Sequence, residues 1–304
     1  MKDIMNLKDK TGAGIKDCKE ALEKCKGDME KAIAYLREKG IASAAKKADR
    51  IAAEGTVGVY SDAKTGVIVE VNSETDFAGK SDKFQALVKK IAEHIAASKA
   101  TTVEALLKET HAKDKKTIND IVTEAIATIG EKISIRRFER FTATGSGVVC
   151  VYSHFGKIGV VVELSCEKAA SAKNKDVAEL GKNVAMQIAA SNPLYLDESG
   201  VPTAELEKER DILRNKAKAE KKPDNIIEKM LEGQVKKYYG EVCLVHQAFI
   251  KDPSKKISNV VAETGTAAGD KISIKRFARF ELGEGIEKKV EDFAEEVKKA
   301  AAAK

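Results

Sequence analysis

The chain has 304 residues, 43% of them hydrophobic and 34% charged, a balance that is typical of a soluble globular protein with two or three domains. Its formal net charge is +6, but lysine, arginine and acidic residues alternate in sign along the predicted helices, as on solvent-exposed helix surfaces. No apolar run approaches the roughly 18 residues needed to span a bilayer, and the first thirty residues match neither a signal peptide nor a transit peptide. We therefore expect a cytoplasmic protein without membrane contact.

The cysteines give no framework for disulfides or metal. They are odd in number, form no CxxC pair and have no histidine at metal-ligand spacing: Cys18, Cys25, Cys150, Cys166 and Cys243. We expect reduced, mostly buried thiols, no metal site and no cofactor.

Residues 1–52 predict a small helical module followed by a linker. Apolar residues recur at helical spacing in three segments: Ile4 and Leu7; Cys18, Ala21, Leu22 and Cys25; Met29, Ile33 and Leu36. The third helix is expected to end at Gly40, and the Ala/Lys-rich segment after it is expected to run on as a helical or flexible linker.

The remainder contains a repeat of strands and helices. The strands VGVY and VIVEV, followed by an apolar-striped helix, return at a constant offset of 93 residues: Gly66 and Gly159, Glu70 and Glu163, Leu87 and Leu180. The segment ISIRRFERF from Ile133 matches ISIKRFARF from Ile272 at an offset of 139. The difference, 139 − 93 = 46 residues, indicates an insertion between Ser191 and Ile257.

The inserted residues predict a projecting helical hairpin. One arm carries Leu206, Ile212, Leu213 and Ala217, and these can face Ile226, Ile227, Met230, Leu231 and Val235 on the other. A last amphipathic helix is expected to carry Ile286, Val290, Phe293 and Val297.

The turn VNSETDFAGK, from Val71 to Lys80, leaves a strand and enters a helix. An ordinary interpretation makes Phe77 a core residue and Asp76 or Ser81 a helix cap. However, Thr75, Asp76 and Phe77 stand opposite Lys168, Ala169 and Ala170 in the second copy, at unchanged loop length. The fold therefore does not require an aromatic residue there, which favours an exposed anchor for a partner.

Four motifs carry a resemblance to a known family. TGAGIKDCKEAL, the TDF that follows VEVN, HFGKIGVVVEL and ELGEGIEKK are similar, in this order and over the whole chain, to bacterial elongation factor Ts. The resemblance implies nucleotide exchange on elongation factor Tu, without covalent catalysis. It also implies that the Asp-Phe turn inserts between two helices of the partner's GTPase domain and disturbs the site of Mg²⁺ and the GDP phosphates.

The expected fold is α+β, with a three-helix, UBA-like N-terminal module and two pseudo-repeated sheet-plus-helix subdomains. The expected boundaries are 1–52 for the module and linker, 53–142 for the first core subdomain, 143–192 with 238–280 for the second, 193–237 for the antiparallel hairpin and 281–304 for the C-terminal helical module.

By the same resemblance, Thr75, Asp76, Phe77 and Ala78 form the partner-binding turn. Lys8, Ile15 and Lys16 of the N-terminal module and His154 of the second subdomain are implied as further contacts. Lys16 departs from the apolar residue that is common there, and Ala78-Gly79 replaces a bulkier pair, which predicts a looser turn.

Two other functions remain to be weighed. The Arg, Lys and Phe side chains that alternate in ISIRRFERF and ISIKRFARF could bind RNA or the ribosome, although alternation of inward Ile and Phe favours a core strand with a solvated face. An enzyme is disfavoured, because the chain shows no catalytic triad, carboxylate dyad or HExxH motif, and TGAGIKD lacks phosphate-loop spacing. We expect no direct nucleic-acid binding, and association of two copies within a larger complex is possible.

Overall fold

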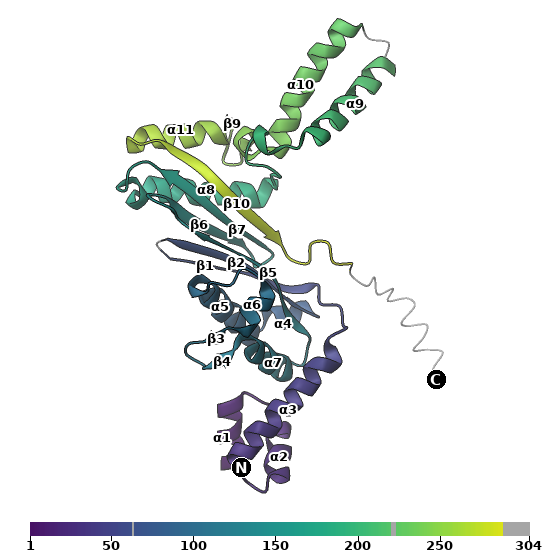
Figure 1. Ribbon diagram of the computed structural model, residues 1–304, viewed down its shortest axis with the longest axis vertical. Helices are drawn as coiled ribbons and strands as arrows, with labels where there is room; N and C mark the ends of the chain where they lie inside the picture. Colours follow the sequence, from purple (N-terminus) through teal and green to yellow (C-terminus); the bar gives the residue numbers. More distant parts are fainter. Residues whose placement is uncertain (63, 220–222, 288–304) are drawn as a thin grey trace. The chain divides into compact units, whose positions relative to one another are not determined.

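The computed structural model describes residues 1–62, 64–219 and 223–287 and has the predicted mixture of helices and strands (Figure 1). The α-helices are α1 (Lys2–Thr11), α2 (Ile15–Lys24), α3 (Met29–Lys47), α4 (Asp76–Lys80), α5 (Asp82–Ala97), α6 (Val103–Lys108), α7 (Ile118–Ile129), α8 (Lys175–Ser191), α9 (Thr203–Ala219), α10 (Asp224–Val242) and α11 (Ile257–Ala268). The strands are β1 (Glu54–Ser61), β2 (Thr65–Ser73), β3 (Thr110–His111), β4 (Lys116–Thr117), β5 (Ile133–Thr142), β6 (Val148–His154), β7 (Ile158–Cys166), β8 (Ala248–Phe249), β9 (Asp252–Lys256) and β10 (Ile272–Glu281). Short 3₁₀ helices cover Ser171–Lys173, Glu198–Gly200 and Leu244–His246.

Within the described residues, the strands form two three-stranded sheets, in the orders β1-β2-β5 and β10-β7-β6, and two small two-stranded ones, β3-β4 and β8-β9. Strands β6 and β7 pair antiparallel from Val148 opposite Leu164 to His154 opposite Ile158. The last strand of each copy thus joins its sheet beside the second strand. The element bounds follow the offsets seen in the sequence, since β7 begins 93 residues after β2 and β10 begins 139 residues after β5.

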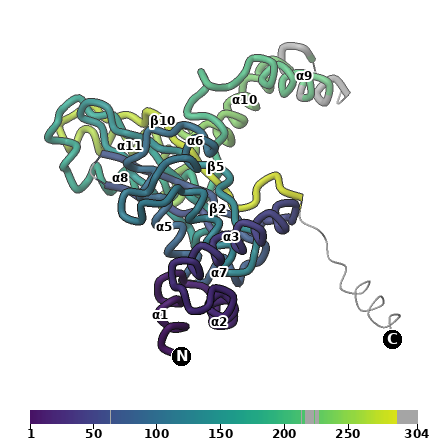
Figure 2. Tube along the Cα trace, turned by 60° about the horizontal axis from the view of Figure 1, so that its bottom comes forward, coloured from purple at the N-terminus to yellow at the C-terminus, as the bar shows by residue number. Residues whose placement is uncertain are grey.

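The N-terminal helices α1, α2 and α3 pack around one small core (Figures 1 and 2). Its buried members are Leu7, Cys18, Ala21, Leu22 and Ala32. The Asp28 side chain caps α3 by accepting a hydrogen bond from the Lys31 backbone N–H at 3.1 Å.

The predicted end of the third helix at Gly40 is wrong, because α3 continues to Lys47. Gly40 is buried, and a Cβ built on it would lie 3.3 Å from the Cβ of Ala127 in α7. Glycine here permits close contact between two helices and does not end one. Ile33, which was expected in the module's core, is instead partly exposed.

The chain divides into two compact units. The first contains residues 1–58, 69–138 and the segment from 281 onwards, and the second contains residues 59–68 and 139–280. The sheet of the second unit covers α8 and α11 through a core that includes Val162, Leu180, Ile188 and Val261. The predicted domain boundaries stay a prediction.

Helices α9 and α10 lie side by side as a pair (Figure 1). At its base, the backbone N–H of Leu194 bonds to the carbonyl of Val242 and that of Leu244 to the carbonyl of Tyr195, each at 2.9 Å. The buried apolar side chains described in the pair are Ile227 and Leu231. Ile212 was expected to face the other arm but is 52% exposed. The side chains of Leu213, Ala217 and Ile226 lie outside the described residues.

After β10 the chain turns through Gly283 and Gly285, both at positive φ. The predicted C-terminal helix falls mainly on residues 288–304, which lie outside the described residues. Among the helices of the described ranges, none combines the length and the apolar character needed to cross a membrane.

Candidate partner-binding turn

The turn after β2 is built from two consecutive helix starts. The Thr75 hydroxyl accepts a hydrogen bond from the Ala78 backbone N–H at 3.2 Å, so Thr75 is the N-cap of the short helix α4. Ser81 caps α5 in the same way, through the Phe84 N–H at 3.4 Å. Ser81 was an expected cap, whereas Asp76 is the first residue of α4 and not its cap.

Phe77 lies on this turn with 83% of its surface exposed, although aromatic side chains of its size contribute strongly to cores when they are buried. Its neighbour Ala78 is buried, and the Phe84 side chain, seven residues further on, is fully buried. The sequence-based expectation that Phe77 is exposed and not a core residue is therefore confirmed, and its role as an anchor for a partner stays a prediction.

The turn is held tightly against β1. Gly79 lies so close to Gly55 that a Cβ added to Gly79 would be 2.9 Å from the Gly55 Cα. The Gly79 carbonyl accepts hydrogen bonds from the Gln85 side chain and from the Thr56 hydroxyl, the latter at 3.3 Å. The predicted loosening by Ala78-Gly79 is therefore not what the structure shows, because the small pair allows close backbone packing.

Asp76 lies beside Lys80 one helical turn later, with 2.7 Å between its Oδ2 and the Lys80 Nζ. A hydrogen bond from Lys80 to this carboxylate raises the pKa of the lysine. Because both side chains are solvent-exposed, the pair adds little to stability.

The other predicted contacts lie on separate elements. Lys8 is half-buried on α1, and Ile15 and Lys16 are exposed as the first two residues of α2. Ile15 is 52% exposed. One turn therefore carries Thr75–Ala78. The residues Lys8, Ile15 and Lys16 belong to the N-terminal helices α1 and α2.

His154 ends β6 and is exposed, and its Nδ1 lies 3.0 Å from the Tyr152 hydroxyl. The next residue, Phe155, is 90% exposed and makes an edge-to-face contact with the His154 ring at 4.6 Å between centroids. Phe155 and Gly156 both have positive φ, and the Lys157 backbone N–H donates to the His154 carbonyl at 2.9 Å, which are features of a type I′ turn. Phe155 was not among the residues predicted from the sequence, although an aromatic residue directly before glycine between two strands was an available signal.

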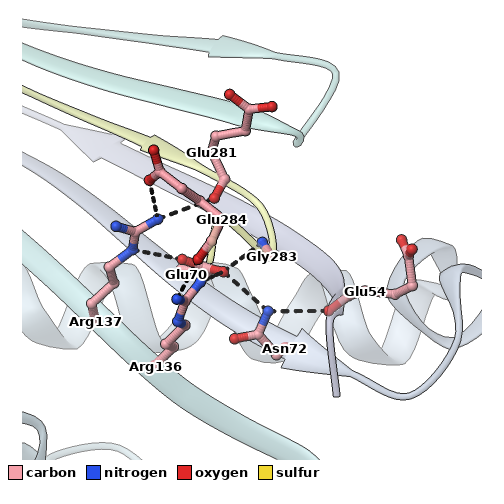
Figure 3. A network of polar contacts seen from close by, with 8 residues as sticks. All are labelled: Glu54, Glu70, Asn72, Arg136, Arg137, Glu281, Gly283 and Glu284. Atoms are coloured by element: carbon pink, nitrogen blue, oxygen red, sulfur yellow. Dashed lines mark hydrogen bonds and ion pairs between the residues drawn. The ribbon is translucent and has the colours of Figure 1, made fainter. Parts of the chain in front are cut away.

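Basic side chains of β5 and β10 form ion pairs with buried carboxylates. Glu70 is fully buried and receives hydrogen bonds from Arg136 at 3.0 Å and Arg137 at 2.6 Å, as well as from Asn72 and the Gly283 N–H (Figure 3). Burial alone would raise the pKa of Glu70, but these hydrogen bonds outweigh it and hold the pKa below its usual value.

The second copy repeats this arrangement. Glu163 is buried and accepts from Arg276 at 2.6 Å, from Lys275 at 3.2 Å and from the Thr144 N–H at 3.2 Å. The Arg276 guanidinium also lies over the Phe141 ring, 4.1 Å from its centroid. Cations that neutralise buried carboxylates are structural, which argues against reading these strands as an RNA-binding surface.

Within residues 1–62, 64–219 and 223–287, no three His, Cys, Asp or Glu side chains gather in a way that could hold a metal ion. All five cysteines are free, and Cys18, Cys166 and Cys243 are buried. A rigid scaffold that presents an exposed aromatic ring on a fixed turn is the construction of a protein-docking module. This is the class of protein that the fold and the turn define.

Comparisons with known proteins identify the family. A family model described as elongation factor TS matches residues 74–284. The chain is 51% identical to elongation factor Ts of Clostridium perfringens (strain SM101 / Type A) over 301 residues, which cover 98% of this chain and 97% of that protein. It is 48% identical to elongation factor Ts of Trichlorobacter lovleyi, with 99% and 98% covered, and 48% identical to that of Halothermothrix orenii, with 98% and 97% covered.

The chain therefore belongs to the elongation factor Ts family. Its function is nucleotide exchange on elongation factor Tu during translation elongation, and it is not an enzyme. The resemblance found in the sequence motifs is confirmed.

Proposed function

We propose that the turn Thr75–Ala78 performs the exchange by docking on the GTPase domain of elongation factor Tu. Phe77 enters between two helices of that domain, and Asp76 contacts their neighbourhood. The observation that carries this proposal is the 83% exposure of Phe77 on a turn whose adjoining residues are buried or hydrogen-bonded. A fixed base allows an inserted ring to displace the partner's helices instead of yielding itself.

Displacement is sufficient for exchange. Mg²⁺ requires near-ideal octahedral geometry and bridges phosphate oxygens to protein ligands, so a shift of about 1 Å in those ligands loosens both the ion and GDP. No bond is made or broken in the nucleotide. GDP leaves because binding of this chain and binding of GDP weaken each other.

Further contacts hold the complex together. Lys8, Ile15 and Lys16 of the N-terminal helices grip the GTPase domain, and His154 meets a second part of the partner. We add Phe155 to this second contact, since its ring is 90% exposed and its backbone is in a conformation that is unusual for an aromatic residue.

The proposal includes the expected domain plan: 1–52, 53–142, 143–192 with 238–280, 193–237 and 281–304. The protein would act in the cytoplasm on elongation factor Tu, without direct contact to nucleic acid. Association of two copies within a larger complex stays a prediction.

The proposal is tested by release of labelled GDP from purified elongation factor Tu in the presence of Mg²⁺. Phe77→Ala should slow stimulated release at least about thirtyfold, the factor that corresponds to ~2 kcal/mol of lost anchoring. Lys168→Ala, at the equivalent turn of the second copy, should have little effect. If folded Phe77→Ala stimulates release as well as the parent chain does, the turn does not displace the partner's helices, and the N-terminal module becomes the better candidate for that role.

A further inference from the structure

Two short segments next to the turn hold each other through reciprocal hydrogen bonds. The Glu131 Oε2 accepts the Thr75 backbone N–H at 2.9 Å, and the Glu74 Oε1 accepts the Lys132 backbone N–H at 2.6 Å. Each acidic residue thus bonds to the backbone of the residue that follows the other. The two segments are far apart in sequence, and Glu74 is held further by Arg50 at 3.1 Å.

Glu131 makes a second bond that reaches the start of α4. Its Oε1 accepts the Thr75 hydroxyl proton at 2.6 Å, while the same hydroxyl oxygen accepts the Ala78 N–H at 3.2 Å. A hydroxyl has one proton to donate, so donation to Glu131 fixes its rotation and directs a lone pair towards Ala78. The Glu131 carboxylate therefore orients the cap of the helical turn that carries Phe77.

Comparison with the second copy shows which of these hydrogen bonds both copies of the repeat share. Asp270 is equivalent to Glu131 at offset 139, and Lys168 is equivalent to Thr75 at offset 93. The Asp270 Oδ2 accepts the Lys168 backbone N–H at 3.0 Å, which keeps the backbone bond. Its Oδ1 accepts the N–H of Lys271 at 2.8 Å, and lysine at position 168 has no hydroxyl to donate. Asp270 also receives a side-chain hydrogen bond from Ser171, which is equivalent to Ala78 at offset 93. What is particular to the copy that carries Phe77 is a bond from the carboxylate to the hydroxyl of the capping residue itself, Thr75.

We propose that Glu131 is a positioning residue that acts on Phe77 through the Thr75 hydroxyl. Its carboxylate holds the cap of α4 so that the ring of Phe77 is presented in one orientation. This inference rests on the proposed function of the turn. Without the carboxylate, the hydroxyl rotates freely, the first turn of α4 frays, and the ring reaches the partner's helices in the required position only part of the time.

The test uses the full chain and compares stimulated GDP release from elongation factor Tu at saturating concentrations. Glu131→Ala and Thr75→Val should each reduce the maximal rate about tenfold, the change that loss of one hydrogen bond to a charged group produces. Thr75→Ser should recover most of the rate that Thr75→Val loses, because it restores the hydroxyl. In the double variant Glu131→Ala/Thr75→Val, the rate should fall by clearly less than the product of the two single losses, because both substitutions remove the same hydroxyl bond and each removes one further bond of its own.

Asp270→Ala provides the matched control, because it removes the equivalent backbone bond in the copy without the aromatic ring. It should change the melting temperature as much as Glu131→Ala does and leave the release rate unchanged. A merely structural role of Glu131 would give both variants the same effect on release, and additive losses in the double variant would show that Glu131 does not act through Thr75. Either result would overturn the inference.

The inference and the proposed function fail in different ways. If Phe77→Ala is inactive and Glu131→Ala is as active as the parent chain, the turn drives GDP release but Glu131 does not position it. If Phe77→Ala is fully active, the function proposed for the turn fails first. Should Glu131→Ala fail to fold, Thr75→Val and Thr75→Ser change an exposed side chain and still decide the question.

Discussion

The Glu70 carboxylate accepts the backbone N–H of Gly283 at 2.8 Å, although 213 residues separate them in the chain. Thr144 plays the same part for Glu163, and Gly283 follows Thr144 by 283 − 144 = 139 residues, the offset of the repeat. Each copy thus ends in a segment that caps the buried carboxylate of the other copy. This swap of end segments between the two copies explains why the turn after β10 belongs to the first compact unit.

Replacing Glu70 should destabilise the fold. Glu70→Gln keeps the shape of the side chain but removes the charge that faces Arg136 and Arg137, and leaves buried donors poorly paired. We expect the free energy of unfolding to fall by about 1–3 kcal/mol. Urea unfolding measures this, with Glu284→Gln as the control, because the Glu284 bond to Arg137 is largely solvent-exposed and should contribute under about 1 kcal/mol. Equal stabilities of the parent and Glu70→Gln would contradict the structural role given to this carboxylate.

Lowering the pH should remove the stabilisation that the Glu70 carboxylate provides. The pKa of Glu70 is lowered in the folded chain from its ordinary value of 4.5, so the unfolded state binds the proton more readily. The stabilisation is therefore complete above about pH 4.5 and is lost as pH falls towards the folded-state pKa. Unfolding of the parent chain should become easier in this window, and Glu70→Gln should show a shallower dependence. If the parent chain and Glu70→Gln lose stability in parallel as the pH falls, Glu70 does not cause this pH dependence.

Glycine at position 55 should be essential to the packing beneath the turn. Its φ is +125°, and a Cβ there would lie 2.2 Å from the Val71 carbonyl oxygen. Gly55→Ala should therefore lower the free energy of unfolding by about 3 kcal/mol or more. Gly233→Ala, in the open face of α10, should instead raise it by about 0.5–1 kcal/mol. Thermal melting of the two variants distinguishes a required glycine from a tolerated one, and a shift in the same direction for both would count against the contact.

Phe155 should show a conflict between stability and binding. Phe155→Asn creates an Asn-Gly pair, which suits the type I′ turn, and should raise the free energy of unfolding by about 1 kcal/mol. The same change should weaken the complex with elongation factor Tu about tenfold, because an exposed aromatic contact is lost. Lys115→Asn is the control, since Lys115 has a similar φ of 52°, and it should stabilise the chain without affecting the complex. Unchanged affinity in Phe155→Asn would remove Phe155 from the proposed contacts.

The sequence predicted those features that depend on local periodicity or on comparison of the two copies. Apolar alternation marked β2 and β7, helical spacing marked α5 and α8, and the constant offsets placed their bounds in register. The absence of an aromatic residue opposite Phe77 indicated exposure, which the position of the side chain bears out.

Other features depend on contacts between distant residues, which local patterns do not contain. Gly40 carries an ordinary helix-end signal, and only its contact with Ala127 explains why α3 continues. The bonds from Thr75 to Glu131 span 56 residues, so no local pattern contains them. The basic residues Arg136 and Arg137 could be read as solvent-facing until their buried partner was known.

The mutual weakening of this chain and GDP tests the account most directly. The dissociation constant of the chain is measured for nucleotide-free elongation factor Tu and for its Mg²⁺–GDP complex, and by linkage their ratio equals the factor by which the chain weakens GDP binding. We predict a large ratio for the parent chain and a ratio at least about tenfold smaller for Phe77→Ala, with circular dichroism showing both to be folded. A parent chain that binds both forms equally tightly, or a Phe77→Ala variant that keeps the full ratio, would contradict the claim that Phe77 drives nucleotide release.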